Sequence, residues 1–231
     1  MPASTSFQTD GGKGAPSRSV IYLGLVVALV LPYLTYLLVG GIFGKEQSVA
    51  RVVIGMVVHW INLLAVLFVV LQLERQPLSS IGLRPWRWGT LFFGVLAGFV
   101  VLLSYPLIAM LNSRLGLTTD ESLFRFLASL SFWIRLGVVL TAGFFEETLY
   151  RGYAFERITY LTGSKWLAGV VTLAAFTLMH IPAVGFVHLL PVFIVGLFVT
   201  LLYIWRRNLA LNIVAHIVID GIALLVLPAL K

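Results

Sequence analysis

Long runs of apolar residues, each about twenty positions in length, alternate with short polar segments along most of this chain. A helix of about 20 mainly apolar residues crosses the hydrocarbon core of a bilayer. The pattern therefore predicts about seven transmembrane helices. Their expected ranges are 20–43, 52–73, 88–111, 136–157, 166–180, 186–204 and 209–227.

Two segments depart from this pattern. Residues 1–18 are rich in Ser, Gly, Thr and Pro and are expected to form a disordered tail before a single transmembrane domain over 19–231. Residues 112–134 mix charged and aromatic side chains, which is typical of an amphipathic helix at the membrane interface. The part 122–134 would add an eighth span if it is buried.

Composition places the whole chain in the membrane class. Of its 231 residues, 60% are hydrophobic and 11% are charged, and the mean hydropathy is +1.01. A soluble domain has roughly 25% charged residues. The predicted fold is therefore an all-α, polytopic transmembrane helical bundle.

The net positive charge of the chain is explained by the distribution of basic residues in membrane proteins. The formal net charge is +7, but the 16 Lys and Arg residues stand singly between apolar runs rather than together on one element, so nucleic acid is not an expected partner. With a cytoplasmic N-terminus, the larger share of these residues falls on the inner side, as the positive-inside rule requires. We expect a multi-pass protein of a bacterial-type cell membrane, with the lipid bilayer as its surroundings.

Three ionisable side chains stand together inside the fourth predicted span. Glu146 lies midway between Arg135 and Arg157, eleven residues from each, or about 16 Å along a helix. Charged groups near the bilayer centre are costly and usually functional. Glu147 and Arg151 are four residues apart on one face and are expected to pair. Glu146 is rotated by about 100° and is left to face another group.

Two later predicted spans also carry polar residues. His180 is followed by Pro182, which must break or end the helix. Asn212, His216 and Asp220 recur every four residues and form one polar stripe, which cannot face lipid cheaply. Either histidine alone would be typical of hydrogen-bonded packing. Together with an unpaired glutamate on a third span, they indicate a convergent cluster of carboxylate and imidazole groups.

Three short motifs therefore follow one another on the late spans. They are Glu-Glu-x-x-x-Arg at Glu146, Glu147 and Arg151; Phe-x-x-x-His at Phe176 and His180; and His-x-x-x-Asn/Asp at His216 and Asp220. In this order they resemble the CAAX prenyl protease and bacteriocin-processing family of intramembrane proteases, also called CPBP or Abi. The resemblance covers roughly residues 136–225.

The resemblance implies an all-helical membrane fold with a polar intramembrane cavity, and an activity. The expected reaction is hydrolysis of a peptide bond by a water molecule that Glu146 and His180 activate. His216 and Asp220 would then stabilise the oxyanion. The remaining motif residues would support the site; they are Glu147, Arg151 and Phe176.

Asp220 stands where members of the family also carry asparagine. An ionised aspartate cannot donate a hydrogen bond to an oxyanion and would repel it. Three roles are therefore open. Asp220 is kept protonated by burial, or it orients His216, or it helps to hold a cation.

The residue types support this chemistry and leave a cofactor open. A glutamate near an imidazole suits general-base hydrolysis of an amide, and neither Gly-x-Ser-x-Gly nor His-Glu-x-x-His occurs. The chain contains no cysteine. Glu146, His180 and His216 could still hold one divalent metal such as zinc, so the cofactor is either none or such a metal.

The expected partner is a membrane-associated or hydrophobic peptide substrate, which the resemblance extends to a prenylated one. Two other classes of function remain open from the sequence. Buried Glu, His and Asp also form proton or ion paths in transporters, although no inverted repeat is visible. The same fold could also serve as a non-catalytic membrane immunity or scaffold protein.

Overall fold

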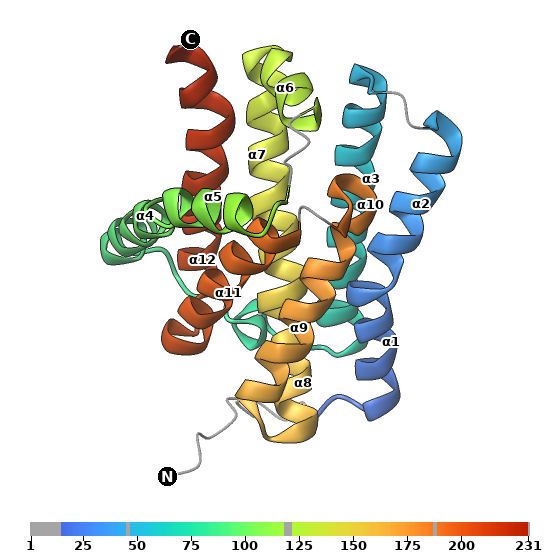
Figure 1. Cartoon of the computed structure of the whole chain (residues 1–231). Coiled ribbons are helices and arrows are strands. Elements are labelled where there is room, and N and C mark those ends of the chain that lie inside the picture. The colour runs from blue at the N-terminus through green and yellow to red at the C-terminus, as the bar shows by residue number, and fades with distance from the viewer. Residues whose placement is uncertain (1–14, 45–46, 118–121, 187–188, 231) are drawn as a thin grey trace.

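The chain folds into a bundle of helices. The structure, a computed structural model, describes residues 15–44, 47–117, 122–186 and 189–230. These residues form helices and no strands, and most of the long helices lie side by side (Figure 1). The predicted all-α membrane bundle is therefore confirmed. Six helical stretches are long and apolar enough to cross a membrane: Arg18–Phe43, Val49–Leu73, Trp88–Arg114, Lys165–Val184, Leu189–Arg206 and Leu209–Ala229.

Prolines mark three of the places where a new helix begins. Pro32, Pro106 and Pro182 each stand in the first turn of a helix, where a backbone N–H has no intrahelical partner to lose. The break predicted at Pro182 is thus confirmed. The first helix begins at Arg18, and residues 1–14 of the expected tail lie outside the described residues. The helices up to the middle of the chain are α1 (Arg18–Leu29), α2 (Leu31–Phe43), α3 (Val49–Phe68), α4 (Trp88–Leu102) and α5 (Tyr105–Arg114).

The fourth expected span, which is not among these six stretches, is also helical. Helix α7 (Phe132–Glu146), a π-helical segment (Glu147–Ala154) and α8 (Phe155–Thr162) form one continuous helix, about 46 Å long at 1.5 Å per residue. It is long enough to cross a bilayer but is the most highly charged of the long helices, since it carries the first motif. The remaining helices are α6 (Ser122–Ser129), α9 (Lys165–Met179), α10 (Ile181–Val184), α11 (Leu189–Arg206) and α12 (Leu209–Gly221).

The eighth span that was left open is not found. Helix α6 has eight residues, none of which is buried. At 1.5 Å per residue it is about 12 Å long, less than half of a hydrocarbon core. It is a short exposed helix ahead of α7, as expected for an interfacial segment.

Small residues bring α12 close to α4. A Cβ atom added at Gly94 would lie 2.7 Å from the Cβ of Val214, and one added at Gly98 would lie 2.7 Å from the Cβ of Val218. Two glycines four residues apart let helix backbones approach closely in membranes. Gly143 of α7 approaches α12 from another side in the same way. Helix α12 is therefore held tightly between α4 and α7.

A buried ion pair joins the segment after α3 to α8. The Nη2 atom of Arg157 lies 2.6 Å from the Oε2 atom of Glu74, and both side chains are buried. The hydroxyl of Tyr153 donates to Glu74 at 2.7 Å, and Arg157 also donates to the carbonyl of Ser80. Arg157 was expected to mark the end of a span at the membrane surface. The structure adds that the guanidinium is neutralised by Glu74 inside the bundle.

A second ion pair lies one residue earlier on α8. Glu156 accepts hydrogen bonds from Arg207 and, at 2.7 Å, from the hydroxyl of Tyr203. The backbone N–H of Leu209, the first residue of α12, donates to the carbonyl of Gly82. The loop after α3, helix α8 and the start of α12 are thus fastened to one another at the same end of the bundle.

The glycine contacts of α4 yield a prediction. Gly98→Ala should lower the melting temperature of the purified protein, because its Cβ has no room beside Val218, and overpacking generally costs about 1–3 kcal/mol. Gly41→Ala is the matched control, since no atom lies within 4 Å of a Cβ at that position. Equal melting temperatures for the two variants in a detergent melting assay would contradict the packing described for α12.

Candidate active site

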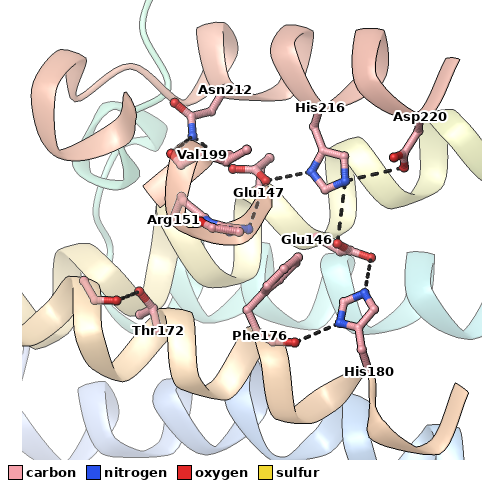
Figure 2. Close-up of polar contacts among 12 residues, drawn as sticks. Glu146, Glu147, Arg151, Thr172, Phe176, His180, Val199, Asn212, His216 and Asp220 are labelled. Atoms are coloured by element: carbon pink, nitrogen blue, oxygen red, sulfur yellow. Dashed lines mark hydrogen bonds and ion pairs between the residues drawn. The ribbon is translucent and has the colours of Figure 1, made fainter. Parts of the chain in front are cut away.

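The first motif lies where the helix changes its winding. Glu146 is the last residue of α7, and Glu147 opens the π-helical segment. The sequence predicted an uninterrupted α-helix here. Single π-helical turns inside α-helices are rare and occur frequently at functional sites. The two neighbouring glutamates contact different sets of side chains and have only His216 in common (Figure 2).

Glu147 is fully buried and accepts three hydrogen bonds. Its Oε1 atom lies 3.0 Å from Nη1 of Arg151 and 2.7 Å from Nδ1 of His216. Its Oε2 atom accepts from the side-chain amide of Asn212 at 3.1 Å. The predicted pair of Glu147 with Arg151 is confirmed, whereas the contacts with Asn212 and His216 were not foreseen. Because the paired carboxylate only accepts, the Nδ1 atom of His216 must carry a hydrogen.

Phe176 supports both the arginine and the other histidine. The guanidinium of Arg151 lies 4.2 Å from the centre of the Phe176 ring and also donates to the carbonyl of Gly196 at 3.2 Å. The lack of a side chain at Gly196 leaves room for the same ring. The carbonyl of Phe176 lies 2.8 Å from Nδ1 of His180. A carbonyl only accepts, so this contact directs the Nε2 atom of His180 away from its own helix.

Glu146 lies between the two histidines. Its Oε1 atom is 3.9 Å from Nε2 of His180, and its Oε2 atom is 3.7 Å from Nε2 of His216 (Figure 2). Asp220 approaches the same imidazole, with 3.5 Å between its Oδ2 atom and Nε2 of His216. The structure thus brings all four predicted reactive side chains together. They come from α7, the end of α9 and α12.

Exposure divides the cluster into a closed side and an open side. The side chain of Glu147 has no exposed surface, whereas Glu146 is 16% exposed. The exposed fraction rises to 25% for His180 and 31% for Asp220. Glu147 is therefore enclosed in the bundle, whereas three of the four groups predicted to react are partly exposed; the fourth, His216, is buried.

The metal hypothesis finds no preformed ligand set. In the described part of the chain, no group of three or more His, Cys, Asp or Glu side chains is arranged to hold a metal ion. The two imidazole Nε2 atoms face different oxygens of Glu146, at 3.9 Å for His180 and 3.7 Å for His216.

The sequence analysis missed the roles of two residues that support the site. Asn212 was recognised as part of a polar stripe, but its bonds to Glu147 and to the carbonyl of Val199 show that it supports the buried carboxylate. Gly196 gave no polar signal, and its role as carbonyl acceptor and as space for a ring follows only from the packing of α11 on α9.

Comparisons with known proteins bear on this region of the chain. Residues 128–222 match the family model described as type II CAAX prenyl endopeptidase Rce1-like. No curated protein and no solved structure matches the chain. The matched residues include all seven side chains of the three motifs. The resemblance to the CAAX prenyl protease and bacteriocin-processing family of membrane proteases is thereby confirmed for this region of the chain.

Proposed function

We propose that this protein is an intramembrane endopeptidase that cleaves a membrane-associated or hydrophobic peptide with water activated by Glu146 and His180. The observation that carries the proposal is the position of Glu146, whose carboxylate faces two imidazole Nε2 atoms while the neighbouring Glu147 holds the site together. One carboxylate is thus available for proton transfer. The other is occupied by its partners.

The distance between Glu146 and His180 suits a water-mediated contact. At 3.9 Å, Oε1 of Glu146 and Nε2 of His180 are too far apart for a direct hydrogen bond. One water molecule between them can donate one hydrogen to each, because Nδ1 of His180 carries the ring hydrogen that bonds Phe176. Glu146 would take a proton as the water oxygen attacks the substrate carbonyl carbon. The same proton then passes to the leaving amine as the C–N bond breaks.

His216 supports the proposal for the oxyanion. Its Nδ1 hydrogen is used by Glu147, so the Nε2 atom is the one turned toward Glu146 and Asp220. As an imidazolium, the ring would present an Nε2–H to the oxygen that becomes negative in the tetrahedral intermediate. Asp220 would act beside it, either as a protonated donor or as the partner that orients the ring.

The substrate class follows from the surroundings and from the family. The proposed reactive groups lie among apolar helices. We therefore propose that the peptide reaches them within the bilayer or through a polar cavity. The matching family is described as a prenyl endopeptidase, which makes a prenylated peptide one candidate substrate. We further propose a cytoplasmic N-terminus, in line with the excess of basic residues on that side.

The first prediction concerns the general base. Glu146→Gln should reduce kcat in a membrane-peptide cleavage assay by at least about 100-fold, because an amide cannot accept the proton and general acid–base catalysis contributes about 10²–10⁴-fold. The melting temperature should stay near that of the wild type, since Glu146 holds no structural pair. Cleavage at an undiminished rate would remove Glu146 from this role.

A different outcome is expected for Arg151. Arg151→Ala should lower the yield and the melting temperature, because it leaves Glu147 buried without its cation, and breaking a buried pair generally costs about 3–5 kcal/mol. Arg125→Ala, which removes an exposed arginine of α6, is the control for the loss of charge alone. If the Arg151 variant melts like this control, Glu147 does not depend on the pair.

The metal hypothesis can be tested directly. If the site works without a metal, activity should survive exhaustive chelation, and elemental analysis of the active protein should show no stoichiometric zinc. Zinc at about one per chain, lost and restored together with activity, would instead assign Glu146, His180 and His216 as its ligands.

Asp220 has two roles that a pH–rate profile separates. If Asp220 donates a hydrogen bond to the oxyanion, Asp220→Asn should keep or raise activity at neutral pH, because asparagine donates in every protonation state. The wild type should then lose activity at high pH, and the variant should lack this limb. If Asp220 orients His216, Asp220→Asn should lower activity throughout. Identical profiles would remove Asp220 from the mechanism.

A further inference from the structure

An arginine at the end of α11 contacts two aromatic rings. The guanidinium carbon of Arg206 lies 4.9 Å from the ring centre of Phe93 on α4 and 4.9 Å from that of Trp205. No carboxylate of the described residues pairs with Arg206. Aromatic rings that stack on a guanidinium help to fix its orientation and leave the N–H groups at its edge for an acceptor.

The rings place this arginine at the outer surface of the bundle. Phe93 is 42% exposed and Trp205 is 72% exposed, and both stand on helices long and apolar enough to cross a membrane. Trp88, at the start of α4, is exposed as well. Exposed tryptophans at helix ends are typical of the level of the lipid headgroups. An acceptor for Arg206 therefore comes from the bilayer rather than from a pocket inside the protein.

This end of the bundle is rich in free positive charge. Its acidic side chains among the described residues, Glu74 and Glu156, are both bound to arginines. Exposed basic residues surround them on neighbouring elements, at the start of α1, in the loop before α4 and at the start of α9; they are Arg18, Arg75, Arg84, Arg87 and Lys165. A basic surface of this kind attracts the anionic lipids of one leaflet.

We propose that Arg206, in contact with the rings of Phe93 and Trp205, binds the phosphate of an anionic phospholipid. The guanidinium edge matches phosphate oxygens in geometry and charge. Binding there bears on the active site, because the next residue, Arg207, pairs with Glu156 on α8, and α12 with His216 begins two residues later. A bound lipid would brace the junction between α11 and α12. The proposal does not depend on proteolytic activity.

The test measures lipid binding to the full-length protein in detergent by native mass spectrometry. We expect phosphatidylglycerol to bind more tightly than phosphatidylcholine, and Arg206→Ala to weaken phosphatidylglycerol binding about fivefold, the effect typical of one arginine near an anionic surface. Phe93→Leu keeps the charge and an apolar side chain but removes one ring, and should weaken binding about threefold. This second variant serves if Arg206→Ala does not fold.

The control is Arg125→Ala on α6, which Figure 1 shows at the end of the bundle opposite the turn between α8 and α9. It makes the same change in net charge and should leave phosphatidylglycerol binding unchanged. Equal losses for the Arg125 and Arg206 variants would show general charge attraction and overturn the site. Displacement of phosphatidylglycerol by millimolar inorganic phosphate would assign the arginine to a soluble anion and overturn the lipid proposal.

Discussion

The buried carboxylate of Glu147 is the interaction on which the rest of the site depends. A charge with no exposed surface is tolerated inside an apolar bundle only when its partners satisfy it, and Glu147 has Arg151, Asn212 and His216 around it. These partners lie on its own helix and on α12. Through Arg151, which rests on Phe176 and bonds to a carbonyl of α11, the same charge also fixes α9 and α11.

This arrangement explains why two adjacent glutamates can differ so much. Glu147 forms structural hydrogen bonds, and its bond to Nδ1 of His216 determines that the Nε2 atom of this ring faces Glu146. The carbonyl of Phe176 does the same for His180. Both imidazoles are thus oriented from behind by groups that do not face the accessible side. The Nε2 atoms can face Glu146 because the Nδ1 atoms are bonded to Glu147 and to the carbonyl of Phe176.

The sequence predicted the elements of this site because helix geometry acts over short distances. Four-residue spacing predicted the pair of Glu147 with Arg151 and the polar stripe on α12, and both are present. Spacing cannot tell which distant group meets a given face, so the contact of His216 with Glu147 was missed. The partner of Arg157 was missed for a related reason. A charge at the end of an apolar run looks the same whether water or Glu74 neutralises it.

Two ion pairs at one end of the bundle hold in place the helices that carry Glu146 and His216. At the fastened end, the pairs of Arg157 with Glu74 and of Arg207 with Glu156 tie α8 to the loop after α3 and to the start of α12. Since α8 continues the helix that carries Glu146, and α12 carries His216, these contacts limit how far the two helices can slide. Glu146 makes no direct hydrogen bond to His180 or His216, at separations of 3.9 and 3.7 Å. In the proposed function, these groups can therefore exchange partners with water and substrate while the helices that bear them stay fixed.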